Sequence, residues 1–103
     1  MKHTDVIVIG SGLAGLTAAL ASAQQGRSVT LLSYGSSSLS LNSGLIDFLG
    51  YDDSHKAVKS PREGILGLPE THPYSKIGME EIAEAVDFFR DFAKEYHMPY
   101  HGS

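Results

Sequence analysis

The feature that most constrains this chain is a glycine-rich turn between an apolar run and a helical pattern. Residues 5–9 read Asp-Val-Ile-Val-Ile, a β-branched run typical of a strand buried on both faces in a parallel sheet. From Leu13 onward, apolar residues recur at helical spacing, with small Ala and Thr residues between them. This order predicts a strand, a tight turn and a helix that packs close to the strand.

A second strand is expected at residues 28–33. Gly26 stands where the end of a helix needs a residue that tolerates left-handed geometry. The following Ser-Val-Thr-Leu-Leu-Ser has the composition of a strand. Strand, helix and strand together predict one right-handed βαβ crossover, with the glycine turn at the carboxyl end of the first strand.

The turn itself has the spacing of a dinucleotide-binding fingerprint. Gly10 would permit the tight turn, Gly12 would let the backbone approach a phosphate, and Gly15 would let the helix lie close to the strand. Unpaired N–H groups at the start of the helix would face the anion. A glycine-rich turn without a ligand is the alternative. The predicted class is α/β, with a Rossmann-like βαβ fold of the FAD/NAD(P)-binding type. Its predicted phosphate-binding residues are Gly10, Ser11, Gly12, Leu13, Ala14 and Gly15.

The end of the second strand lacks a carboxylate. Nicotinamide and FAD sites commonly place Asp or Glu there, about twenty residues after the glycines, to bind the adenosine ribose. This chain has Ser33 at that position, and a hydroxyl makes a weaker bond than a carboxylate. Two interpretations stay open. The ligand is FAD held mostly through its phosphates, or it is FMN, which has no adenosine.

The return from the second strand, residues 34–43, is rich in Gly and Ser. It passes the carboxyl end of the sheet, where nucleotides bind in such folds. Its polar groups are therefore expected to bond phosphate and the edge of a flavin ring, although a solvated serine linker is the alternative. Leu39 and Leu41 favour an ordered loop.

The remaining chain carries less chemistry. Residues 45–49 are expected to form a short buried helix or turn, and residues 50–73, which contain three prolines, an irregular surface excursion. Residues 79–96 show a clear helical stripe that Pro99 ends. Asp47 is interpreted as a turn or cap residue. No catalytic acid, base or nucleophile is assigned, and His97 and His101 lack a third ligand for a metal.

Composition excludes several classes. With 103 residues the chain can bury one modest core, and without cysteine it supplies no disulfide or iron–sulfur ligand. A net charge of −4 without a basic stripe makes nucleic acid an unexpected partner. Residues 6–26 are uncharged, so a signal peptide or a membrane span is an alternative for this segment. The three glycines and the early Asp5 favour a soluble domain instead.

Three segments carry a more specific resemblance. Residues 6–16, the Ser37-Ser38-Leu39 loop running to residues 43–47, and the His-Pro-Tyr-Ser of residues 72–75 together resemble the family of B subunits of anaerobic glycerol-3-phosphate dehydrogenases. The similarity covers most of this chain but only the beginning of that larger protein. Residues 1–103 are therefore expected to be the N-terminal part of a flavin-binding or dinucleotide-binding domain.

The resemblance implies binding residues, an activity and partners. It matches Gly10, Gly12, Ala14 and Gly15 to the phosphate turn, and Ser37, Ser38, Ser43 and Gly44 to the loop beside the flavin. It implies a flavoprotein, usually associated with FMN in that family, in a complex that oxidises glycerol 3-phosphate to dihydroxyacetone phosphate and reduces membrane quinone. The implied partners are a second flavin subunit, which is regarded as catalytic in that family, and an iron–sulfur subunit that anchors the complex at the membrane. This places the chain in the cytoplasm, peripheral to the inner face of the cell membrane. The alternatives are a fumarate-reductase-like FAD oxidoreductase, an NAD-linked dehydrogenase, which Ser33 argues against, and a non-catalytic nucleotide-binding assembly module.

Overall fold

The computed structural model describes residues 3–102, which divide into two compact units. The first extends to Leu45 and the second begins at Ile46. The first holds strand β1 (Val6–Ile9), helix α1 (Leu13–Gln24), strand β2 (Val29–Leu32) and the short 3₁₀ helix η1 (Ser38–Leu41). The second holds helices α2 (Pro61–Leu66), α3 (Pro73–Ile77) and α4 (Met79–Glu95).

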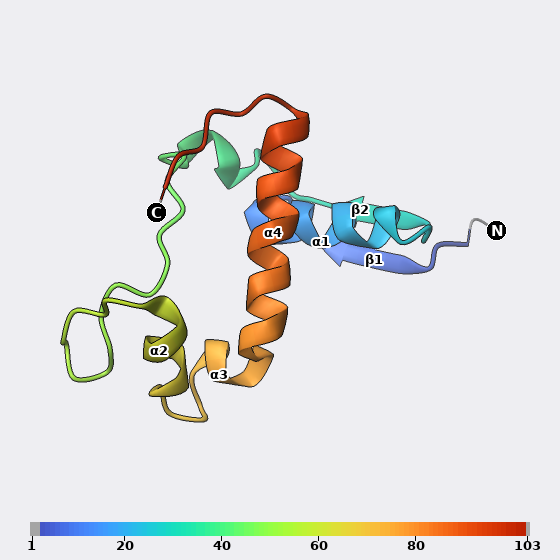
Figure 1. Ribbon diagram of the computed structural model, residues 1–103. Helices are drawn as coiled ribbons and strands as arrows, with labels where there is room; N and C mark the ends of the chain where they lie inside the picture. Colours follow the sequence, from blue (N-terminus) through green and yellow to red (C-terminus); the bar gives the residue numbers. More distant parts are fainter. Residues whose placement is uncertain (1–2, 103) are drawn as a thin grey trace. The chain divides into compact units, whose positions relative to one another are not determined.

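The first unit is the predicted βαβ crossover. Strands β1 and β2 pair in parallel, with Val6 opposite Val29 and Ile9 opposite Leu32, and α1 packs on both strands (Figure 1). Residues 6–26 thus form a strand, a turn and a helix rather than one apolar helix. At the end of α1, Gly26 has φ 78° and its N–H donates to the Ala23 oxygen. The glycine therefore ends the helix as predicted.

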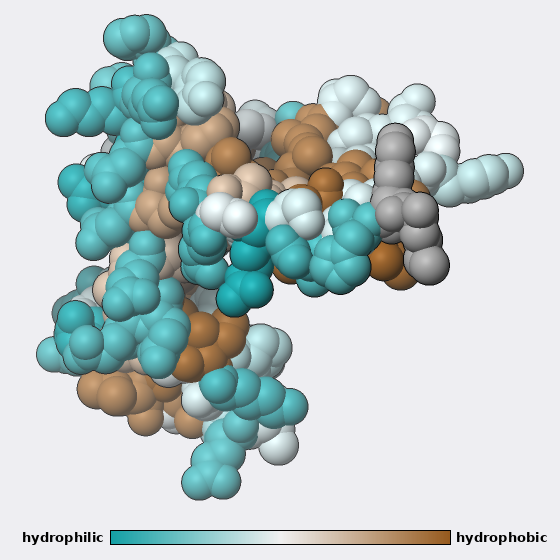
Figure 2. Space-filling model, turned by 90° about the vertical axis from the view of Figure 1, so that its right-hand side faces the viewer, coloured by the Kyte–Doolittle hydropathy of each residue, from teal (hydrophilic) through white to brown (hydrophobic). Residues whose placement is uncertain are grey.

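Burial of the first strand differs from the prediction. Val8 is buried, but Ile7 and Ile9 are 59% and 84% exposed. Because side chains alternate across a strand, α1 covers one face of the sheet and leaves the other face open in this chain. Apolar side chains also reach the surface elsewhere, as the brown patches in Figure 2 show. The expectation of a strand covered on both faces is therefore wrong for the chain as described.

The second unit is built from three packed helices. Its buried side chains are Ile65 of α2 and Ile82 and Ala93 of α4, and each of the three helices contacts the other two. Helix α4 confirms the helix that the apolar stripe predicted. It ends at Glu95 with Tyr96 as its cap, after which His97 adopts φ 55° and donates its N–H to the Lys94 oxygen. No helix in the described part of the chain is long and apolar enough to cross a membrane.

Two sequence interpretations fail between residues 45 and 73. Residues 45–49 form no helix, and Leu45 and Ile46 are exposed, while the Phe48 ring stacks on Tyr74 with centroids 5.3 Å apart. Within residues 50–73, predicted as irregular, Pro61 begins helix α2. The sequence interpretation treats proline there as a breaker, but its fixed φ and missing N–H suit the first position of a helix.

Pro73 behaves in the same way. It opens α3 directly after His72, whose Nδ1 accepts a hydrogen bond of 3.1 Å from the Tyr74 N–H. The histidine ring thus replaces the usual serine or aspartate as the cap of this helix. The His-Pro-Tyr-Ser segment of residues 72–75, on which the family resemblance partly rests, therefore has a local structural role in the second unit.

Candidate functional site

The glycine turn joins the carboxyl end of β1 to the start of α1. Gly10 has φ 106°, which favours glycine, and its N–H donates to the Leu32 oxygen at 2.8 Å, so it extends the pairing of the strands by one bond. Gly12 caps α1 in extended geometry, with φ −72° and ψ −178°. Helix α1 begins at Leu13, as the motif predicts.

The start of α1 has neither a side-chain cap nor a negative charge. Gly12 has no side chain to cap the helix, and the first turn holds no acidic residue. The first N–H groups of a helix lack partners within the helix, and the helix dipole places partial positive charge there. The donor set at residues 12–15 therefore suits a phosphate group, which brings three or more acceptor oxygens and negative charge.

Gly15 brings the helix close to the strand. A Cβ at this position would overlap the Gly10 carbonyl oxygen and would lie 3.4 Å from the Val8 Cγ1. No other residue type fits without moving the backbone. This geometry agrees with the role that the motif predicts for the third glycine.

The serine-rich loop returns to the glycine turn. Ser37 caps η1, since its Oγ accepts a hydrogen bond from the Leu39 N–H at 3.1 Å, and it donates its own hydrogen to the Ser11 carbonyl oxygen at 2.5 Å. Ser38 is also close, because a Cβ at Gly12 would lie 3.2 Å from its Oγ. The structure therefore brings Ser37 and Ser38 to the predicted phosphate turn, although Leu39 and Leu41, which were expected to order the loop, are 37% and 88% exposed. The hydrogen bond from Ser37 to Ser11 could not be predicted from the pattern of apolar residues in the sequence.

The other candidate residues are Ser33, beside the glycine turn, and Ser43 and Gly44, which bond within their own segment. Ser33 follows β2 and is exposed; continuing the strand register places it beside Gly10. Ser43 and Gly44 make local bonds: the Ser43 Oγ accepts from the Leu45 N–H, and the Gly44 N–H donates to the Asn42 Oδ1. These bonds form a small turn after η1. No backbone hydrogen bond among the described residues joins that turn to residues 10–15.

At the opposite end of the strands, Asp5 and Ser28 form a clamp. The Asp5 carboxylate accepts bonds from the Ser28 N–H at 2.8 Å and from the Ser28 Oγ at 2.9 Å, and the Asp5 N–H donates to that same Oγ. The two bonds to the carboxylate, first that from the backbone N–H, lower the pKa of Asp5 below its ordinary value of 3.8. This clamp closes the amino end of the strand pair, and the sequence did not predict it.

Comparison with protein families shows which type of nucleotide-binding domain this chain contains. The family described as "FAD binding domain" matches residues 5–103. The chain belongs to the FAD-binding domain family. This membership confirms the Rossmann-like α/β class and the prediction of a flavin cofactor.

Relatives of this FAD-binding domain carry a consistent name. The chain is 44% identical over 95 residues to the B subunit of a probable anaerobic glycerol-3-phosphate dehydrogenase from Halobacterium salinarum, covering 91% of this chain and 22% of that protein. It is 38% identical over 104 residues to the B subunit of the anaerobic glycerol-3-phosphate dehydrogenase from Vibrio cholerae, covering 98% and 24%. The chain thus spans about a quarter of the length of these relatives. No solved structure gives a significant match.

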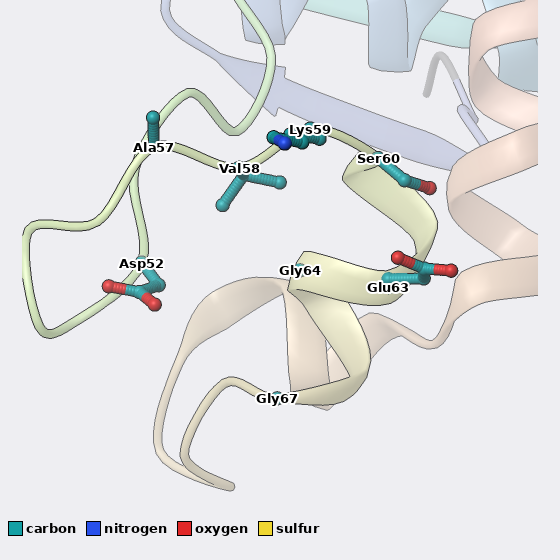
Figure 3. Close-up of a pocket in the computed structure, with 8 residues that line it drawn as sticks. All are labelled: Asp52, Ala57, Val58, Lys59, Ser60, Glu63, Gly64 and Gly67. Atoms are coloured by element: carbon teal, nitrogen blue, oxygen red, sulfur yellow. The ribbon is translucent and has the colours of Figure 1, made fainter.

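The second unit holds a separate hollow of about 270 Å³. Figure 3 shows that it lies between residues 52–60 and helix α2. It is slightly smaller than the range of about 300–1,000 Å³ that is usual for ligand pockets. The Asp52 carboxylate is engaged by the Ser54 and Lys56 N–H groups. The hollow is lined by Asp52, Ala57, Val58, Lys59, Ser60, Glu63, Gly64 and Gly67.

Proposed function

We propose that this FAD-binding domain is the N-terminal part of the flavin-binding B subunit of a quinone-linked glycerol-3-phosphate dehydrogenase. The observation that carries the proposal is the uncapped start of α1, next to which Ser37 bonds the Ser11 carbonyl oxygen. The chain that holds this turn is similar to proteins of that name. A bound flavin would supply the two-electron oxidation of the substrate alcohol.

The residues proposed to hold the flavin phosphate are those of the turn, with Ser38 beside it. The N–H groups of residues 12–15 would donate to phosphate oxygens, and the lack of a side chain at Gly12 would let a phosphate approach the backbone. Ser33 replaces the ribose-binding carboxylate, so the adenosine half of FAD would be held with fewer strong bonds than in most FAD sites. Ser43 and Gly44, in the turn after η1, are proposed to lie beside the flavin ring.

The substrate and partners form the finer part of the proposal. Glycerol 3-phosphate would be oxidised to dihydroxyacetone phosphate, with both electrons passing to membrane quinone. The chain has no cysteine, so iron–sulfur clusters in that path would be carried by another subunit. A second flavin subunit and an iron–sulfur anchoring subunit are the proposed partners. They would hold the protein at the cytoplasmic face of the cell membrane.

The test uses the full-length protein and its assembled complex. The purified full-length chain is expected to be yellow and to release FAD or FMN, which mass spectrometry identifies. In the anaerobic complex, adding glycerol 3-phosphate is expected to bleach the flavin absorbance and, with quinone present, to form quinol.

Three outcomes would redirect the proposal. A colourless full-length protein contradicts it entirely. Flavin that is reduced through the complex by succinate, or that reduces fumarate, but does not respond to glycerol 3-phosphate would favour a fumarate-reductase-like enzyme. A bound nucleotide that no donor reduces would favour an assembly module.

A further inference from the structure

The Ser11–Gly12 peptide decides whether the turn offers a donor or an acceptor to an anion. In a planar trans peptide the carbonyl and the N–H point in opposite directions. The Ser11 oxygen and the Gly12 N–H belong to the same peptide. Fixing the direction of one therefore fixes the direction of the other.

This peptide lies outside the helical hydrogen-bond ladder. The first helical bond runs from the Leu16 N–H to the Gly12 oxygen, so neither the Ser11 oxygen nor the Gly12 N–H belongs to it. Glycine at position 12 makes rotation of the peptide easy, because it lacks a Cβ. A rotated peptide would aim a carbonyl oxygen, with its partial negative charge, at the phosphate.

Ser37 holds this peptide in one orientation. Its Oγ–H donates to the Ser11 oxygen at 2.5 Å across 26 residues of sequence, in a partly buried position. A serine hydroxyl has one hydrogen to donate, and the Ser37 oxygen also accepts from the Leu39 N–H. In this arrangement the Ser37 hydroxyl has no hydrogen left for a phosphate oxygen.

We propose that Ser37 is a positioning residue for the flavin phosphate, which holds the Ser11 carbonyl aside so that the Gly12 N–H faces the anion. This rests on the proposed binding of flavin and changes the predicted role of Ser37 from direct contact to orientation. The nucleotide-binding turn is then completed from a loop that follows the second strand.

The test compares two ligands that differ in phosphate. FAD and riboflavin share the flavin ring, but only FAD carries phosphates. In the full-length protein, Ser37→Ala is expected to weaken FAD binding about tenfold, the effect of losing one well-formed hydrogen bond, and to leave riboflavin binding unchanged. Flavin fluorescence titration measures both. Ser37→Thr, which keeps the hydroxyl, is expected to bind FAD within about twofold of wild type.

Controls separate orientation from folding. Ser36→Ala removes an exposed hydroxyl from the same loop and is expected to bind FAD like the wild type. Thermal unfolding of the flavin-free variants shows whether each is folded at the titration temperature. If Ser37→Ala is not folded, Ser37→Cys keeps the side-chain volume with a weaker donor, and the same selective loss of FAD binding is expected.

The inference is overturned if Ser37→Ala binds FAD as tightly as the wild type, or if FAD and riboflavin lose affinity by the same factor. A wild type that binds no flavin would sink both the inference and the proposed function. A wild type with the expected FAD selectivity that does not respond to glycerol 3-phosphate would sink the proposed function alone.

Discussion

The hydroxyl of Ser37 lies 2.5 Å from the carbonyl oxygen of Ser11 and ties the loop after β2 to the glycine turn after β1. The two residues are far apart in sequence, yet they meet because parallel strands end at the same edge of their sheet. Nucleotides bind at that edge in folds of this class. Substitutions at this contact therefore test the geometry of the proposed site.

Gly15→Ala is expected to destabilise the protein. The new Cβ would overlap the Gly10 carbonyl oxygen, so helix α1 or the turn must shift. Overpacking of this kind typically costs about 1–3 kcal/mol. Urea unfolding of the full-length protein measures the loss. Gly50→Ala is the control, because a Cβ there meets nothing within 4 Å. Equal stability of the two variants would contradict the close approach.

Gly12→Ala is expected to impair binding more than folding. The Gly12 backbone is extended and accepts alanine, but the Cβ would lie 3.2 Å from the Ser38 Oγ and would crowd the path of a phosphate. FAD affinity should fall about tenfold or more, or about 1.4 kcal/mol. Equilibrium titration with FAD measures it, alongside urea unfolding. Unchanged affinity would show that phosphate does not approach at this position.

Removing the Asp5 carboxylate should change how stability depends on pH. The pKa of Asp5 is lowered in the folded state, because the carboxylate accepts bonds from the Ser28 N–H and hydroxyl. Its stabilising contribution is therefore complete above the ordinary value of 3.8 and is lost as the pH falls through the lower, folded-state pKa. Wild type should exceed Asp5→Asn in stability near neutral pH, and the difference should shrink below pH 3.8.

Urea unfolding of both proteins at a series of pH values checks this. Asp53→Asn, which changes an exposed aspartate in a surface turn, is the matched control and should show no such trend. A constant difference between wild type and Asp5→Asn across the whole pH range would argue against the clamp.

His97→Gly is expected to stabilise the protein. His97 occupies the left-handed region at φ 55° after α4, where its N–H and that of Met98 bond the Lys94 and Ala93 oxygens. Glycine adopts this conformation without steric penalty, and the gain over a residue with a Cβ is roughly 0.5–1 kcal/mol after its larger unfolded-state entropy is subtracted. Thermal unfolding measures the shift. His101→Gly, outside the left-handed positions, should give no gain; a gain of the same size there would point to a general effect of removing histidine.

The elements that sequence reasoning recovered are those with a strong local signal. The β-branched run, the glycine spacing and the helical stripe predicted β1, α1, β2 and α4 within one or two residues. The short helices α2 and α3 were missed because proline both ends and begins helices, and only the surrounding packing selects between these roles. Buried Ile65 shows that packing for α2.

The candidate site divides in the same way. The turn at residues 10–15 could be predicted from sequence, because each glycine allows a backbone conformation or close contact that involves residues only a few positions away. The convergence of Ser37 and Ser38 on that turn was expected only in outline, and the separate local turn at Ser43 and Gly44 was not foreseen. A serine-rich loop has many accessible conformations of similar energy, so its contacts depend on where its ends are held.

The sequence by itself determined the βαβ class, the glycine turn and the absence of a carboxylate after β2, because local sterics, hydrophobic periodicity and residue identity are properties of short segments. Only the tertiary structure decided that Ser37 donates its hydrogen to Ser11, that Asp5 and Ser28 clamp the opposite end of the strands, and that α1 covers one face of the sheet. These relationships join residues distant in the chain, and their geometry exists only once the strands have paired and the crossover helix has packed on them.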